Sequence, residues 1–142
     1  MTSFVLDASV ASALLLDENE GAQAEPVLAL MQSGKALVPL LWHLEVRNSL
    51  LSASRRGRLS GTELAERLED LQDLPLGTDS DLDLDAAFRL AETHSLSIYD
   101  AVYLELAKRH AIPIATFDKA LSQAAVQENI SLVCSYSFPI SK

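Results

Sequence analysis

Phe4-Val5-Leu6-Asp7 is the stretch of sequence on which the fold depends. Three apolar residues are followed by an aspartate, and the apolar segment 8–16 comes directly after it. This order predicts a buried strand, a carboxylate at its C-terminal end and a helix that the carboxylate caps. Open α/β sheets place their functional sites outside the C-terminal ends of their strands. Asp7 is therefore either a helix cap or a functional group, and the rest of the chain has to decide between the two.

Composition and charge describe a folded, acidic protein. The 142 residues suit one domain spanning 1–142, and the 49% hydrophobic and 22% charged residues are ordinary for a soluble chain. The formal net charge of −9 argues against a simple DNA- or RNA-binding module. It argues less against a nuclease, because site carboxylates add negative charge that bound divalent cations offset.

The cellular location is inferred from features that the sequence lacks. Cys134 is the only cysteine, so no intrachain disulfide forms and a reducing compartment is expected. The first residues carry no basic, signal-like segment, and no apolar run approaches the roughly 20 residues that a membrane span needs. We therefore expect a soluble, cytoplasmic protein with no membrane partner.

Strands and helices alternate along the chain, which predicts an α/β domain with a central parallel sheet covered on both faces. The expected strands are 4–6, 36–39, 74–77, 112–116 and 132–134, and the expected helices are 8–16, 22–32, 40–56, 61–71, 84–93, 98–110 and 118–129. Pro26 suggests a late start or a kink in the second helix, and Ser60 with Glu63 forms a capping-box pattern. Residues 79–85 read as an acidic turn.

Four acidic residues are placed to meet at one edge of this sheet. Asp7 and Asp118 follow strands, so both lie at the C-terminal edge. Asp100 begins a crossover helix that runs antiparallel to the strands, which brings its N-terminus to the same edge. Glu45 lies on the 40–56 helix, in a stripe of small and uncharged residues that favours a position facing a cleft.

Each acid has an ordinary structural explanation when it is taken alone. The aspartates suit helix caps and positive helix ends, and Glu45 suits a half-exposed helix position. Together they would repel one another and raise each other's pKa, unless they hold a hard divalent cation. Mg²⁺ and Mn²⁺ are the natural choices for oxygen ligands, and such sites activate water for attack on a phosphodiester.

Four stretches, in this order and at this spacing, resemble a PIN domain, and more narrowly the ribonuclease toxin of a VapBC-type toxin–antitoxin pair. They span nearly the whole chain, and the set is far more specific than any one member. The stretches are Val5-Leu6-Asp7-Ala8-Ser9-Val10, Trp42-His43-Leu44-Glu45-Val46-Arg47-Asn48-Ser49-Leu50, Leu96-Ser97-Ile98-Tyr99-Asp100-Ala101-Val102-Tyr103-Leu104 and Ala115-Thr116-Phe117-Asp118.

The resemblance implies a metal-dependent endoribonuclease whose Mg²⁺ or Mn²⁺ ligands and catalytic acids are Asp7, Glu45, Asp100 and Asp118. It also implies a three-layer α/β/α fold with strand order 3-2-1-4-5. RNA is the implied substrate, and the implied protein partners are a second copy in a homodimer and a cognate antitoxin that blocks the site.

Three further residues enter through the same resemblance. Thr116 is implied as a catalytic-site residue and Ser9 as a helper that hydrogen-bonds around the metal site, with Asn48 as their neighbour. Their ordinary alternatives are a strand-end threonine, a serine in the first turn of a helix and a plain helix asparagine.

Other motifs are weaker. Segment 79–83 alternates acids like a calcium loop, but Leu84 and Leu90 stand where that loop needs glycine and glutamate. His43, His94 and His110 lack zinc spacing, and His43 is expected to be a surface or packing residue.

The basic and aromatic residues leave two readings open. Arg55, Arg56 and Arg58 could contact an RNA backbone or an acidic partner, or simply complement a helix dipole. The aromatic side chains near helix starts could stack on bases, although most such residues belong to the core; they are Trp42, Tyr99 and Tyr103.

Two other functions compete with a nuclease. Acids at strand ends of a small α/β domain also suit a phospho-accepting receiver, but Leu6-Asp7 is not the acid pair that a receiver needs, and Lys119 follows Asp118 on the wrong side. A catalytically silent PIN fold that serves as a scaffold is the other alternative, and the intact acidic quartet argues against it.

Overall fold

The structure is a computed structural model that describes residues 3–16 and 25–134. Its elements are, in chain order, β1 Ser3–Leu6, α1 Ala8–Leu16, α2 Glu25–Ser33, β2 Lys35–Pro39, α3 Leu40–Arg55, α4 Gly61–Gln72, β3 Leu76–Asp79, α5 Leu84–His94, α6 Ile98–His110, β4 Ile114–Ala115, α7 Lys119–Gln127 and β5 Leu132–Cys134.

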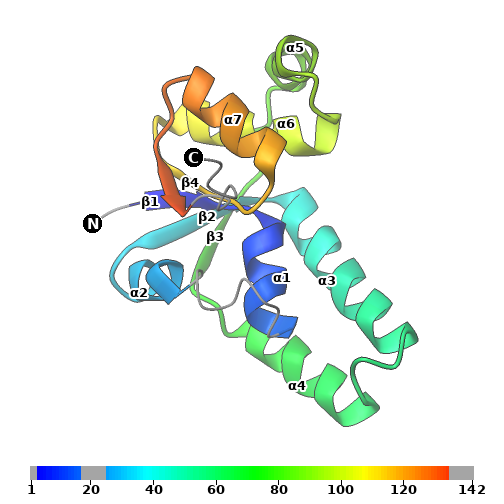
Figure 1. The fold of residues 1–142 in the computed structure, drawn as a ribbon. Helices are drawn as coiled ribbons and strands as arrows, with labels where there is room; N and C mark the ends of the chain where they lie inside the picture. Colours follow the sequence, from blue (N-terminus) through cyan, green and yellow to red (C-terminus); the bar gives the residue numbers. More distant parts are fainter. Residues whose placement is uncertain (1–2, 17–24, 135–142) are drawn as a thin grey trace, which may run out of the picture.

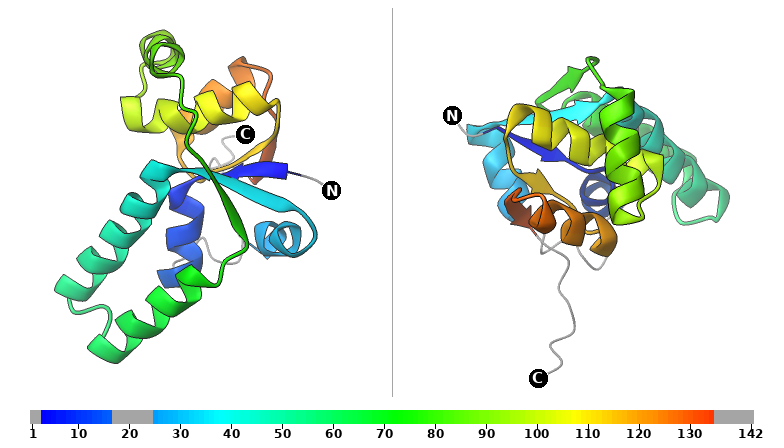
Figure 2. Two further views of the ribbon diagram at one scale, coloured as in Figure 1. Left: turned by 180° about the vertical axis from the view of Figure 1, so that it is seen from behind. Right: turned by 90° about the horizontal axis from the view of Figure 1, so that it is seen from above.

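The five strands form one sheet in the order β3-β2-β1-β4-β5, and every neighbouring pair is parallel. Helices α1 to α4 lie on one side of the sheet and α5 to α7 on the other (Figures 1 and 2). The predicted three-layer α/β/α architecture and strand order are therefore confirmed. Helices α3 and α4 extend together from the sheet as an arm (Figure 1).

Strand β1 is the centre of the sheet, as its apolar sequence predicts. Phe4, Val5 and Leu6 are completely buried, because helices cover both faces of a parallel sheet. Backbone pairing places Leu6 beside Ala115 of β4. The residues that follow these two strands, from Asp7 and from Thr116 onward, therefore leave the sheet side by side.

Strand β3 begins two residues later than predicted, which corrects the sequence-based boundaries. It pairs with β2 over Leu76–Asp79, so that Pro39 lies beside Asp79. A Cβ at Gly77 would lie 2.8 Å from Cε of Lys35, so a larger residue there would require the flexible lysine side chain to move. Asp79 thus ends a strand and does not begin a solvated turn.

Several other boundaries differ from the prediction by one to three residues, among them those of α7, which is Lys119–Gln127 where 118–129 was expected. Strand β4 is reduced to Ile114–Ala115, since Pro113 has no N–H to donate and Thr116 already turns toward the other side chains at the sheet edge. Helix α2 begins at Glu25 in the described residues, with Pro26 in its first turn, where a proline costs no hydrogen bond. Residues 22–24 of the predicted helix and the unassigned tail from Ser135 lie outside the described residues.

The ends of the long helices follow local signals. Arg56 is the C-cap of α3 and Gly57 follows with a φ of +74°, a conformation that glycine adopts without strain. At the start of α4, the Ser60 hydroxyl accepts from the Glu63 N–H and the Glu63 carboxylate accepts from the Ser60 N–H. The predicted capping box is therefore confirmed.

Replacing the capping serine tests how much this box stabilises the arm. We expect Ser60→Ala to lower the free energy of unfolding by about 1 kcal/mol, because the first turn of α4 loses an acceptor for its N–H groups. Urea denaturation measures the change. Thr62→Ala, an exposed position in the same turn, is the control and should change stability by less than about 0.5 kcal/mol.

Candidate functional site

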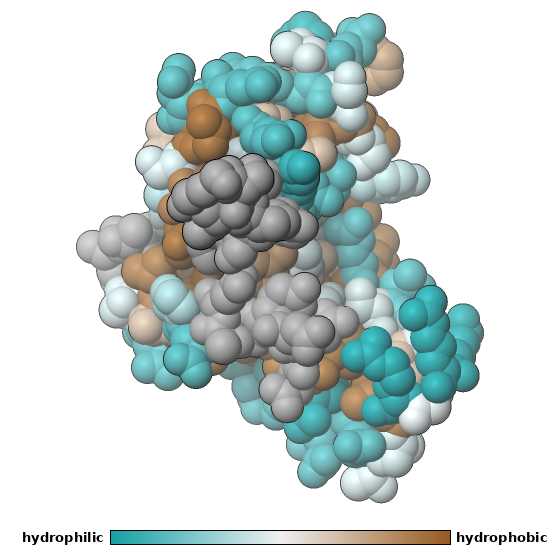
Figure 3. Space-filling view, in the orientation of Figure 1, coloured by the Kyte–Doolittle hydropathy of each residue, from teal (hydrophilic) through white to brown (hydrophobic). Residues whose placement is uncertain are grey.

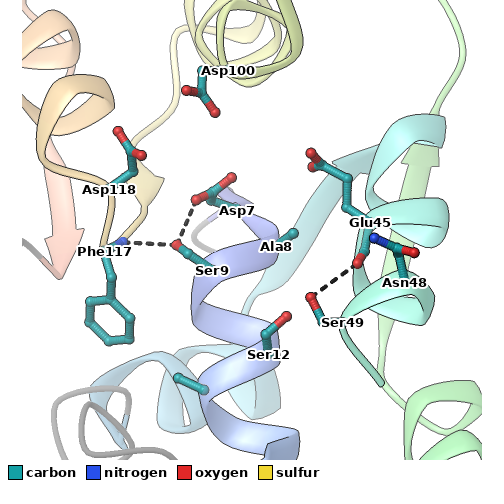
Figure 4. Close-up of a pocket in the computed structure, with 11 residues that line it drawn as sticks. Asp7, Ala8, Ser9, Ser12, Glu45, Asn48, Ser49, Asp100, Phe117 and Asp118 are labelled. Atoms are coloured by element: carbon teal, nitrogen blue, oxygen red, sulfur yellow. Dashed lines mark hydrogen bonds between the residues drawn. The ribbon is translucent and has the colours of Figure 1, made fainter. Parts of the chain in front are cut away.

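A pocket of about 440 Å³ opens at the C-terminal edge of the sheet, and all four predicted acids line it (Figure 4). Asp7 comes from the end of β1, Glu45 from α3, Asp100 from the first turn of α6 and Asp118 from the start of α7. The convergence that the topology predicted is therefore present in the structure.

Asp7 lies at the bottom of this pocket, and two hydroxyls hold its carboxylate. The Ser9 hydroxyl donates to Oδ2 over 2.6 Å and the Thr116 hydroxyl donates to the same oxygen over 2.7 Å. The predicted side-chain cap is wrong, because the hydrogen bonds of the Asp7 carboxylate go to these two hydroxyls and the N–H groups of Val10 and Ala11 bond to the backbone oxygen of Asp7. The Asp7 carboxylate therefore lines the pocket and does not cap the helix.

Thr116 and Ser9 also fix the loop that carries the next acid. The Thr116 hydroxyl accepts from the backbone N–H of Asp118, and the Ser9 hydroxyl accepts from that of Phe117. Each hydroxyl therefore joins Asp7 to the 116–118 segment. Asp118 caps helix α7, because its Oδ1 accepts from the N–H of Leu121. The same residue also lines the pocket.

Glu45 has a partner that the sequence analysis did not identify. The hydroxyl of Tyr103 donates to Glu45 Oε1 over 2.6 Å, and the rest of this tyrosine is completely buried. Tyr103 lies three residues after Asp100 on α6, so both occupy one helix face. That spacing was the available signal, although the sequence by itself favours a core or base-stacking role for Tyr103.

Burial and like charges raise the pKa of three of the acids. Burial is the largest cause for Asp7, and the nearby Glu45 and Asp118 add to it against the lowering effect of its two hydroxyl partners. Burial, together with Asp100, also raises the pKa of Glu45, although the Tyr103 hydrogen bond lowers it. The pKa of Asp100 rises to about 6, through burial and the charges of Asp118 and Asp7.

The pocket offers oxygen ligands and no positive charge. Among the described residues its lining contains four carboxylates, three serines and Asn48, but no lysine, arginine or histidine. A divalent cation would relieve the repulsion that raises these pKa values. Within the described residues, however, no three acidic, histidine or cysteine side chains are already gathered around a single point that could hold a metal ion.

The other singled-out residues lie elsewhere. His43 bonds to the Thr78 hydroxyl and packs edge-on against Trp42, and it does not line the acidic pocket. Trp42 is buried in the core and Tyr99 is exposed. The supposed calcium segment is a strand end and helix cap, because Asp79 pairs with Arg109 and the Asp83 side chain accepts from the N–H of Ala86.

Comparisons with known proteins identify the family and the fold. The sequence model of the PIN domain family matches residues 4–127. Ribonuclease VapC3 of Pyrobaculum aerophilum is 33% identical over 123 residues, which make up 84% of this chain and 92% of that protein. The PIN domain match extends over the elements that carry the four acids.

Solved structures show the same fold. The crystal structure of PAE2754 from Pyrobaculum aerophilum matches with a TM-score of 0.72 and 21% identity, over 95% of this chain and 84% of that one. A chain of a toxin–antitoxin complex from Klebsiella pneumoniae matches with a TM-score of 0.54 and 17% identity, over 81% and 86% of the two chains.

The raised pKa of Asp100 predicts a pH dependence of stability in metal-free protein. Its pKa is about 6 when folded and near 3.8 when unfolded, so the folded state binds more protons between these values. The free energy of unfolding should therefore decrease as the pH rises from about 4 to about 6. Asp100→Asn should flatten part of this slope and stabilise the protein at pH 7 by about 1 kcal/mol, a value reduced for solvent screening.

Urea denaturation in EDTA at four pH values between 4 and 7 measures this effect. Glu92→Gln, which removes an exposed acid from α5, is the control and should keep the slope of the parent protein. The same slope in Asp100→Asn as in the parent would contradict the electrostatic account of the pocket.

Proposed function

Since this chain belongs to the PIN domain family, we propose that it is an endoribonuclease that hydrolyses RNA phosphodiester bonds with Mg²⁺ or Mn²⁺. The meeting of four carboxylates in one pocket is the observation that carries this proposal. The 33% identity to a protein named as a ribonuclease supports the choice of RNA as substrate.

The donor set fits a hard divalent cation. Asp7, Glu45, Asp100 and Asp118 supply only oxygen ligands, which Mg²⁺ and Mn²⁺ prefer. When bound, the cation stabilises negative charge on the phosphate and lowers the pKa of a bound water.

The chain's own residues prepare the site for this reaction. The hydroxyls of Ser9 and Thr116 hold the Asp7 carboxylate in one orientation and in place beside Asp118. We assign Thr116 to the catalytic site for this reason. Asn48 is exposed at the pocket wall, where its amide is available to the substrate.

Tyr103 has a positioning role in this proposal. Its hydroxyl fixes the Glu45 carboxylate relative to Asp100, which lies on the same helix as Tyr103. Groups that hydrogen-bond to ligating carboxylates orient them for the metal. The bond also favours the ionised form of Glu45, whose pKa burial raises.

We further propose that the enzyme acts as the toxin of a toxin–antitoxin pair and that an antitoxin blocks its pocket. A solved complex of that kind has the same fold. A cytoplasmic location stays a prediction. Over the described ranges 3–16 and 25–134, no helix has the length and apolar character that crossing a membrane requires.

A homodimer is part of the same proposal. Large apolar side chains on α3, α5 and α6 are exposed, among them Leu40, Leu84 and Tyr99, and these three line one apolar hollow. Exposed apolar patches of this kind mark interaction surfaces. A second copy would remove them from water.

Loss of one carboxylate tests the reaction. We expect Asp7→Asn to reduce cleavage of a mixed RNA pool at least about 100-fold, because the buried carboxylate at the bottom of the site is gone. EDTA should abolish cleavage by the parent protein, and Mn²⁺ should restore it. Full activity in Asp7→Asn would contradict the assignment, and an inactive parent that still binds Mn²⁺ would favour a silent scaffold.

Removing the Tyr103 hydroxyl tests positioning. We expect Tyr103→Phe to weaken Mn²⁺ binding about 10-fold, measured by calorimetry, since the carboxylate of Glu45 loses its orienting donor. Thermal denaturation should show that the variant remains folded. Tyr99→Phe, on the exposed side of α6, is the matched control, and equal affinities in the two variants would contradict this role.

A further inference from the structure

A second hollow of about 260 Å³ lies beside the acidic pocket, between α1 and the far half of α3. Ser12, Asn48 and Ser49 line both hollows, so the two are continuous. Figure 4 shows Ser12 of α1 and Ser49 of α3 facing each other, with Asn48 beside Ser49 on α3. We call the combined depression the α1–α3 groove.

The charge of the α1–α3 groove changes sign along its length. The acids lie at one end, and Arg56 and Arg58 line the other. Ser52 and the three shared residues supply hydroxyl and amide groups in between, and no carboxylate among the described residues lines the second hollow. The arm that carries the arginines has a largely hydrophilic surface in Figure 3.

Arg56 is the residue best placed to bind an anion there. It is exposed at the C-cap of α3. Its guanidinium makes no hydrogen bond or ion pair within residues 3–16 and 25–134. By contrast, Arg67 and Arg109 pair with Asp70 and Asp79. A cation left unpaired in a protein with a net charge of −9 is available to a negatively charged ligand.

We propose that the α1–α3 groove binds the sugar–phosphate backbone of a single RNA strand next to the bond that is cut, with Arg56 contacting a phosphate. This inference rests on the proposed function. A guanidinium forms strong, charge-assisted hydrogen bonds to phosphate, and serine and asparagine side chains contact backbone oxygens without reading sequence. The groove would thus allow a protein with a net negative charge to bind RNA.

The length of the α1–α3 groove indicates how far an RNA strand must extend to contact both of its ends. Glu45 and Arg56 are 11 positions apart on a helix that rises 1.5 Å per residue, or about 16 Å. An RNA strand must therefore extend several nucleotides from the bond that is cut to reach Arg56.

The binding experiment compares Arg56→Ala with Arg55→Ala. Both arginines are exposed at the same helix end, but Arg55 does not line the groove. A fluorescent 12-nucleotide single-stranded RNA is titrated in EDTA at several salt concentrations. Arg56→Ala should bind about 3- to 10-fold more weakly, and the slope of log K against log salt should decrease by about 0.7, as expected for one lost phosphate contact on a single strand. Arg55→Ala should match the parent.

A cleavage experiment with Mn²⁺ tests the length dependence. Arg56→Ala should lower kcat/KM for the 12-nucleotide RNA and leave it unchanged for a dinucleotide, which does not reach Arg56. Equal losses on both substrates, or an unchanged salt slope, would overturn the proposal. So would weaker binding of polyglutamate together with unchanged RNA binding, since that result would assign the groove to an acidic protein segment.

These experiments distinguish failure of the proposed ribonuclease activity from failure of the proposed RNA binding in the α1–α3 groove. If the parent protein cleaves neither substrate, the proposed function is wrong, and the salt slope in EDTA still decides whether the groove binds RNA. If cleavage is normal and the slope is the same in both arginine variants, only the groove assignment is wrong.

Discussion

Repulsion among four carboxylates in one half-buried pocket is the constraint on which the rest of this structure depends. Asp7 is almost fully buried, and the pKa values of three of the acids are raised. Carboxylates in this situation would turn away from one another if they were free. The fold therefore has to hold them in place, and it does so with neutral donors, not with cations that would occupy the pocket.

The neutral donors are the hydroxyls of Ser9, Thr116 and Tyr103. Each stabilises an ionised carboxylate by hydrogen bonding, but none brings a positive charge that would compete with a metal ion. Thr116 is buried and joins β4 to the end of β1, and Tyr103 joins α6 to α3. The acids are thus supported from both layers of helices and from the sheet.

Arg109 forms its ion pairs away from the pocket. Arg109 near the end of α6 pairs with Asp79 at the end of β3 and with the buried Glu105. This network lowers the pKa of Asp79, mainly through its hydrogen bonds with Arg109, and ties α6 to the edge strand. Since α6 carries both Asp100 and Tyr103, an ion pair far from the pocket helps to hold the helix that shapes it.

By itself the sequence determined the layers, the strand at the centre of the sheet and the edge at which the acids meet. Hydrophobic periodicity and the geometry of parallel strands are local or topological properties, so Asp7, Asp100 and Asp118 could be placed without coordinates. Only the tertiary structure decided which side chains touch, because such contacts join residues far apart in sequence. The Tyr103–Glu45 bond, the bridge from Thr116 to Asp7, the register of β3 and the continuity of the α1–α3 groove all depend on how helices and strands pack against one another. Packing of that kind depends on the whole core, and no single stretch of the chain encodes it.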